Sequence, residues 1–206
     1  MVLAIIGILA TVIVTSHSTF NKTILLSNAA YDVALTIRSA QTFGLGSRST
    51  ENNVPNAGYG VHFDANTPTT FTLFADVDAV NTNNCHGEPV NGPNSPDATP
   101  GNCAYTATEL VRGFSLGNGM SISNFCVYNT GVPKVVCNKV TSATISTLDV
   151  VFARPNTQTF ISTDTVYQKE NIRACIALAS PQGGGSYIYV EQTGAINVNG
   201  AACPTT

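Results

Sequence analysis

A serine between glycines, three histidines and two glycine- or acid-rich loops are the residues of this sequence whose types and spacing could do chemistry. Gly113, Ser115 and Gly117 fit the G-x-S-x-G pattern, which presents a nucleophile only where a strand turns sharply into a helix beside a base. Residues 120–123 alternate like a strand instead, so we expect a glycine-rich turn here. A membrane-anchored secreted hydrolase is only a remote alternative.

The sequence gives only weak signals for ion or phosphate sites, because each candidate residue or loop lacks a partner at the required spacing. His17, His62 and His86 stand apart from other ligands, except that His86 adjoins Cys85, and neighbouring residues cannot easily chelate one ion together. Four oxygen-bearing side chains resemble the alternation of a calcium loop without its glycine turn or terminal glutamate, namely Asp76, Asp78, Asn81 and Asn83. We therefore expect no metal and no cofactor.

The triple glycine at residues 183–185 lacks the Lys-Ser/Thr that follows it in a phosphate-binding loop. With Pro181 before it and Tyr187 after it, this segment predicts a flexible hairpin turn. No nucleophile beside a base and no paired carboxylates stand out elsewhere. We therefore expect a protein that is not an enzyme.

The cysteines are even in number and contain no C-x-x-C pair, which favours disulfides over a zinc site. They are Cys85, Cys103, Cys126, Cys137, Cys175 and Cys203. Six cysteines allow 15 pairings, and the sequence does not choose among them. Our preferred scheme joins neighbours in sequence, because Cys126 and Cys137 bracket a turn signal at residues 129–131. Cys85 would then pair with Cys103, and Cys175 with Cys203.

Composition and charge exclude some classes of partner. Only 10% of the residues are charged, against about 25% in typical soluble domains. The first 50 residues hold three basic residues and one acidic residue, whereas the rest hold six basic and eleven acidic ones. This balance argues against a broad surface for nucleic acid, although a small local patch stays open.

The elements that would carry these residues begin with a helix. Residues 1–14 are uncharged and apolar on all sides, so this segment needs lipid or protein around it. From Leu26 apolar positions recur at spacings of four and three, up to glycines at residues 44 and 46 that end the helix. The membrane or filament-core positions are Met1, Val2, Leu3, Ile5, Ile6, Ile8, Leu9, Val12, Ile13 and Val14. The positions expected to pack against a globular head are Leu26, Ala30, Val33, Ile37 and Ala40.

Beyond residue 46 the period changes to two, which is typical of strands. We predict strands at 59–63, 70–75, 121–128, 134–137, 148–152, 159–162, 174–179, 187–190 and 195–198, and a long loop at 81–101. The predicted fold class is α+β, with a long N-terminal helix, hydrophobic and then amphipathic, followed by an antiparallel β-sandwich-like head. The expected domains are residues 1–46 and residues 47–206.

This order of blocks resembles the type IV pilin-like superfamily. Residues 4–10, Ala-Ile-Ile-Gly-Ile-Leu-Ala, resemble the middle of its signal and transmembrane segment. The head is similar to the GspH/FimT family of minor pseudopilins and minor pilins in the blocks 59–64, 71–76, 148–152 with Arg154-Pro155, and 189–196. The basic leader and Gly-Phe-Thr-Leu-x-Glu-like processing site of that family do not precede Met1, so we expect the sequence to begin inside the helix.

The resemblance implies a structural subunit of a type IV pilus or a type II secretion filament that primes assembly or is presented at the tip. It implies other pilin or pseudopilin subunits as partners, a single-pass location in the bacterial inner membrane before assembly, and a periplasmic or extracellular head. Some FimT-type pilins bind DNA through arginines near the C-terminus, but residues 197–206 contain neither Arg nor Lys. DNA uptake is therefore the alternative function, and nucleic acid is a less favoured partner.

Overall fold

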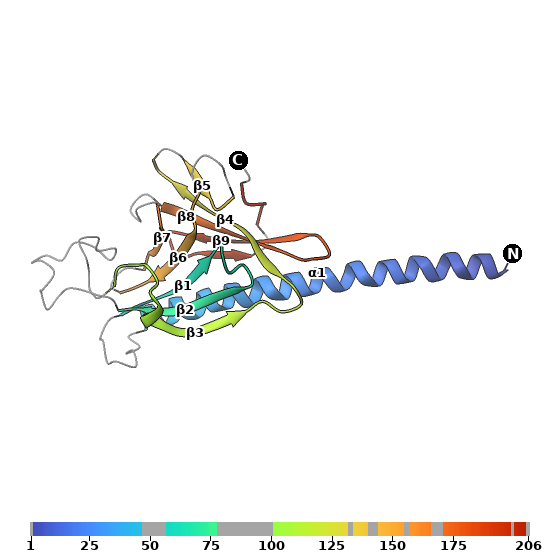
Figure 1. The fold of residues 1–206 in the computed structure, drawn as a ribbon, viewed down its shortest axis with the longest axis horizontal. Coiled ribbons are helices and arrows are strands. Elements are labelled where there is room, and N and C mark those ends of the chain that lie inside the picture. The colour runs from blue at the N-terminus through green and yellow to red at the C-terminus, as the bar shows by residue number, and fades with distance from the viewer. Residues whose placement is uncertain are drawn as a thin grey trace, which may run out of the picture.

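In the residues that it describes, the computed structural model has one α-helix and ten strands, and the strands form two antiparallel sheets (Figure 1). It describes residues 2–46, 57–77, 101–131, 134–139, 144–154, 157–165, 171–198 and 200–204, and the helical side chains from Thr23 onward. The helix α1 has the bounds Val2–Leu45. The strands are β1 Gly58–Asp64, β2 Thr70–Asp76, β3 Leu110–Ser115, β4 Ser121–Asn129, β5 Val135–Cys137, β6 Thr147–Phe152, β7 Thr159–Thr163, β8 Asn171–Ala179, β9 Gly185–Glu191 and β10 Ile196–Val198, with a 3-10 turn η1 at Ala107–Glu109.

The predicted fold class is wrong in its helical half. The helix that takes part in the described fold, residues 23–45, is short, and 47% of that fold is strand. The sequence pattern overstated the length of the helix. An uncharged apolar run is compatible with a helix along its whole length, but it does not show which residues pack against the rest of the protein. Two antiparallel sheets are compatible with the sandwich-like head. The expected boundary at residues 46 and 47 falls where the description of the helix stops.

The strand order explains how the two sheets are built. The first sheet has the order β3-β2-β1-β6-β7, and the second has the order β10-β9-β8-β4-β5. Strand β3 was not predicted; it lies at the edge of the first sheet, and its residues Leu110 and Val111 are exposed. An exposed strand interrupted by Gly113 lacks the alternation of apolar and polar residues that marks a half-buried strand.

One core lies between the inner faces of the two sheets and α1. Alternate residues of the strands enter it, including Val61 and Phe63 of β1, Phe125 of β4 and Ile176 of β8. The end of the helix approaches the first sheet most closely, because a Cβ on Gly44 would overlap the backbone carbonyl of Phe152 in β6. Glycine is therefore the residue that allows helix and strand backbones to meet here.

Candidate functional site

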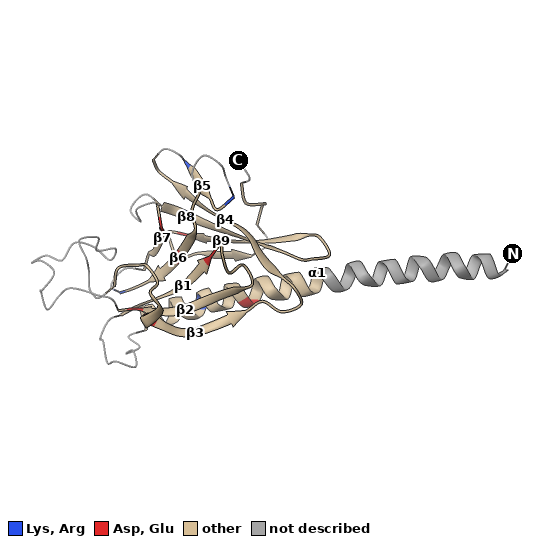
Figure 2. Cartoon of the chain, in the orientation of Figure 1, with Lys and Arg blue, Asp and Glu red and all other residues tan. Residues whose placement is uncertain are grey.

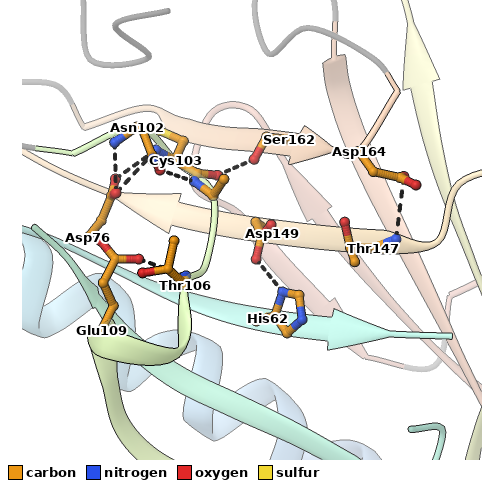
Figure 3. A network of polar contacts seen from close by, with 11 residues as sticks. His62, Asp76, Asn102, Cys103, Thr106, Glu109, Thr147, Asp149, Ser162 and Asp164 are labelled. Atoms are coloured by element: carbon orange, nitrogen blue, oxygen red, sulfur yellow. Dashed lines mark hydrogen bonds and ion pairs between the residues drawn. The ribbon is translucent and has the colours of Figure 1, made fainter. Parts of the chain in front are cut away.

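A network of polar contacts lies on the outer face of the first sheet, under the segment 101–109 (Figure 3). Asp76, at the end of β2, is fully buried, and its carboxylate accepts hydrogen bonds from the backbone N–H of Asn102 at 2.8 Å and of Cys103 at 3.0 Å. A buried carboxylate must be satisfied by donors of this kind, since leaving it alone in an apolar environment is costly. Asp76 thus attaches the segment to the sheet.

Glu109 makes the second attachment. Its side chain is buried and accepts the backbone N–H of Val77 at 2.8 Å and of Thr106 at 2.9 Å. The second bond belongs to a capping box at the start of η1. The hydroxyl of Ser162 on β7 donates to the carbonyl of Cys103. Residues 101–109 are therefore bound to the strand ends on both sides.

A hydrogen bond between a histidine and a buried aspartate lies beneath the same segment. His62 of β1 and Asp149 of β6 are register partners, and Nδ1 of His62 lies 2.7 Å from Oδ1 of Asp149. The Tyr105 ring covers His62 with 4.6 Å between ring centroids. Burial raises the pKa of the Asp149 carboxyl, although the hydrogen bond and charge of His62 and a backbone hydrogen bond from Tyr105 act in the opposite direction.

The order of side chains across the sheet decides what this network can do. Thr72, His62, Asp149 and Ser162 follow one another as cross-strand partners, so the aspartate stands between the histidine and the serine. Nucleophilic catalysis needs the histidine in the middle, where it can take the proton of the hydroxyl. The Ser162 hydroxyl is also engaged with the Cys103 carbonyl. The arrangement is suited to hold the segment and does not activate a nucleophile.

Ser115, the serine of the G-x-S-x-G pattern, lies at the exposed end of β3 opposite Thr70. A turn with a backbone hydrogen bond from Met120 to Gly117 leads from it into β4, and no helix follows within the described residues 101–131. The nucleophile-presenting turn from strand to helix is therefore not formed here.

The possible ion ligands are mostly separated or outside the described residues. His17, Asp78, Asn81, Asn83 and His86 fall outside the described side chains, and Asp76 is engaged with backbone N–H groups. In the part of the chain that the structure describes, no three His, Cys, Asp or Glu side chains are grouped so that they could hold a metal.

Two disulfides lie on the outer face of the second sheet. Cys126 is bonded to Cys137 across the β4–β5 hairpin, and Cys175 of β8 is bonded to Cys203 of the C-terminal segment 200–204. Both pairs are those of our preferred scheme. Cys103 is also in a disulfide. The one cysteine left in the sequence is Cys85, which lies outside the described residues. Disulfides of this number indicate an oxidising compartment.

Aromatic side chains and an arginine surround these disulfides. The guanidinium of Arg173 lies 5.4 Å from the Tyr128 ring and 5.5 Å from the Tyr189 ring, and its Nε is 2.7 Å from Glu191. The Tyr189 hydroxyl donates to the carbonyl of Ala202 in the C-terminal segment. Burial, together with the hydrogen bond between the Tyr128 and Tyr189 hydroxyls, raises the pKa of Tyr128. These contacts add a polar attachment to the covalent one.

The described part of the helix has two apolar stripes, and only one of them was predicted from the sequence. The five residues expected to pack against the head are all buried: Leu26, Ala30, Val33, Ile37 and Ala40. The second stripe was missed. Its members, Ile24, Tyr31 and Leu35, are 43%, 57% and 63% exposed and follow one another at spacings of seven and four. That spacing was the available signal, and it was hidden because a single apolar face was expected.

The predicted membrane segment lies at the start of the helix. The side chains from Met1 to Val14 lie outside those that the structure describes. Among the described residues, no helix combines the length and the apolar character needed to cross a membrane. Where the described side chains begin, a cavity of about 300 Å³ separates Thr23, Leu26 and Ser27 from the glycine turn at residues 183–185, which joins β8 to β9.

Charged side chains are few and dispersed over the described part of the chain (Figure 2). Arg173 is paired with Glu191, and Arg112 lies over the Phe114 ring at 5.1 Å.

Comparisons with protein-family models, with curated proteins and with solved structures give no match to this chain.

Proposed function

We propose that this protein is a structural subunit of a filament outside the cytoplasm, of the minor pilin or pseudopilin kind, and not an enzyme. The observation that carries the proposal is the second stripe of α1. A helix that packs its inner face against its own head has no need of apolar side chains on the opposite face. Ile24, Tyr31 and Leu35 are nevertheless well exposed there.

The occupant of this stripe in the proposal is a helix of a neighbouring subunit. Leu35 and Tyr31 are one turn apart and Ile24 is two turns before Tyr31, so a helix lying along α1 would cover all three. Burial of these side chains would contribute on the order of 1.5–3 kcal/mol for each one fully covered. The uncharged run of residues 1–14 precedes this stripe in the sequence and extends the apolar character of the chain.

The finer localisation is part of the same proposal. The subunit would be held at the bacterial inner membrane through residues 1–14 before assembly, with its disulfide-bonded head in the periplasm or outside the cell. The disulfides support the oxidising side of the membrane. Whether the filament is a type IV pilus or a type II secretion filament does not affect the stripe argument.

The test introduces a charge into the stripe in the full-length protein. Leu35→Asp and Tyr31→Asp should abolish incorporation into filaments in the cells that produce the protein, measured by recovery in the sheared filament fraction. Asp32→Ser, at an exposed position outside the stripe, is the matched control and should assemble normally. Both stripe positions are exposed, so the thermal unfolding of the purified protein should be unchanged. Normal incorporation of Leu35→Asp and Tyr31→Asp would refute the proposal.

A gel shift addresses the alternative of DNA uptake. The described arginines are engaged or dispersed, so the purified protein should give no salt-dependent shift with double-stranded DNA. A shift that weakens steeply with added salt would favour the DNA-binding function instead.

A further inference from the structure

The four cysteines of the second sheet are neighbours as well as pairs. Cys126 of β4 lies opposite Cys137 of β5 on one side and opposite Cys175 of β8 on the other. Partners in antiparallel strands have Cα atoms about 4.5–5.5 Å apart, and disulfides form over Cα distances of about 4.4–6.8 Å. Cys126 is therefore within bonding range of both neighbours, although in the structure it is bonded to Cys137.

The two disulfides differ in access. All four cysteines are buried, but to different degrees. Cys126, Cys137 and Cys175 are fully buried in strands, whereas Cys203 keeps 5% of its surface exposed in the segment 200–204 beyond the last strand. The carbonyl of Pro204 lies 3.4 Å from Sγ of Cys126 and 3.6 Å from Sγ of Cys137. The C-terminal segment thus covers the hairpin disulfide, and an external thiol meets Cys203 first.

We propose that Cys203 is a thiol-exchange site for an external dithiol. Reduction of the Cys175–Cys203 disulfide would then lead to cleavage of the Cys126–Cys137 disulfide by exchange within the protein. A thiolate of the dithiol attacks Sγ of Cys203, the Cys175–Cys203 bond breaks, and its electron pair leaves on Cys175. The second thiol of the dithiol then resolves the mixed disulfide and releases Cys203 as a thiol. The dithiol is oxidised by two electrons, and this disulfide of the protein is reduced by two.

The second step is an exchange within the protein. The Cys175 thiolate attacks Sγ of Cys126, forms the Cys126–Cys175 bond and expels Cys137, which takes up a proton. Arg173 stands two residues before Cys175 on the same face of β8, and a nearby cation favours the thiolate form, although Glu191 shares that charge. The product keeps β4 joined to β8 and frees both Cys137 and the C-terminal segment.

This exchange gives the C-terminal segment a role as a removable cover. When Cys203 is free, the segment keeps only noncovalent attachments, such as the hydrogen bonds of Tyr189 to Ala202 and of Asn124 to Pro204 and the close approach of Gly200 to the Tyr189 ring. Its departure would uncover Tyr189 and the former hairpin disulfide. The partner that this chemistry fits is a dithiol oxidoreductase of an oxidising compartment. The inference does not depend on the filament function proposed above.

The first experiment uses the oxidised wild-type protein and dithiothreitol. One molar equivalent is added under native conditions, free thiols are alkylated with N-ethylmaleimide, and peptides are mapped by mass spectrometry. Most of the singly reduced protein should carry the label on Cys137 and Cys203 together with a Cys126–Cys175 linkage. Labelling of Cys175 and Cys203 with the hairpin bond intact would overturn the proposal, and so would labelling of Cys126 and Cys137.

A single variant tests the internal step without a reductant. In Cys203→Ser, Cys175 has no tail partner, so it should displace Cys137 and leave that residue as the free thiol. Alkylation of Cys137 is the expected result, and alkylation of Cys175 would contradict the exchange. Cys103 is in a disulfide at the other sheet, so its lack of label serves as the internal control in both experiments.

Discussion

The outer faces of the two sheets are both covered by non-regular segments, but different chemistry holds the two covers. Residues 101–109 lie on the first sheet and are held by Asp76, Glu109 and Ser162 through hydrogen bonds to the backbone. Residues 200–204 lie on the second sheet and are bonded to it through Cys175. The strands of the first sheet contain no cysteine, whereas those of the second contain three.

This difference follows from what each cover must satisfy. The segment over the first sheet turns the backbone N–H groups of Asn102 and Cys103 toward the sheet, and the buried carboxylate of Asp76 is the acceptor that matches them. The C-terminal segment is short and ends the described chain, so few of its contacts could offset the entropy of ordering it. A covalent bond supplies what those contacts lack. The first cover is therefore attached to its sheet by buried carboxylates, although Cys103 within it is also in a disulfide, whereas the second cover is attached to its sheet by a disulfide.

The largest effect is expected from removing the covalent attachment. The loop closed by Cys175 and Cys203 spans 28 residues, for which the chain-entropy relation gives about 3.6 kcal/mol of stabilisation. Cys175→Ser combined with Cys203→Ser should lower the free energy of unfolding by about that amount in denaturant titrations. The matched double variant Cys126→Ser with Cys137→Ser opens a shorter loop of 11 and should lose about 2.8 kcal/mol. A larger loss from the hairpin pair would contradict the comparison.

The next largest effect is expected at Asp76. Asp76→Ala leaves the buried N–H of Cys103 and the N–H of Asn102 without their acceptor, which should cost about 2–3 kcal/mol. Asp164 is the control, because it likewise accepts two backbone N–H groups, those of Ser146 and Thr147, but at an exposed position. Asp164→Ala should cost about 1 kcal/mol or less because water can replace the lost acceptor. Equal losses would show that burial of the carboxylate does not matter.

The third effect is a pH dependence of the stability, which comes from Asp149 beneath residues 101–109. Asp149 has a pKa raised by burial, so the folded protein binds this proton more tightly than the unfolded chain does. Its contribution to stability is fully present below the unfolded pKa and is lost as the pH rises through the higher folded pKa. The stability advantage of wild type over Asp149→Asn should therefore shrink as the pH increases over that window. His62, Asp76 and Tyr105 act on this group, and an advantage that grows with pH would show that His62 dominates instead.

The smallest effect is expected at the ion pair of the second face. Arg173 and Glu191 have side chains 43% and 26% exposed, and solvent screening limits such pairs to about 0.2–1 kcal/mol. Glu191→Gln should therefore reduce the free energy of unfolding only slightly, and the reduction should diminish in high salt. A loss as large as that of Asp76→Ala would mean that charge holds the second cover too.

Local signals made part of this structure predictable. The Cys126–Cys137 pair could be predicted because a turn signal lies between two short apolar runs, and the burial of Val33 and Ile37 because helical spacing determines which residues share a face. Strand β3 escaped prediction because its exposed side chains do not alternate. The length of helix that belongs to the fold escaped it because packing, and not propensity, determines that length.

The polar network could not be predicted for a different reason. His62 and Asp149 are 87 residues apart, and Asp76 and Asn102 are 26 apart. Nothing near Asp76 in the sequence indicates that its carboxylate is buried, because the donors that make burial tolerable are backbone groups, which every residue carries. The second stripe of the helix was visible in the sequence, but its meaning depends on which face the head already covers.

The contact between Gly44 and Phe152 has a mechanical consequence. Tension applied along α1 would reach the head through the buried stripe of the helix and, at the helix end, through β6, a strand paired on one side with β1 and on the other with β7. A load entering an interior strand must break hydrogen bonds along two ladders before the sheet yields, whereas a load entering edge strand β3 would meet only one. The glycine therefore lets the end of a pulled helix bear directly on a strand that is held from both sides.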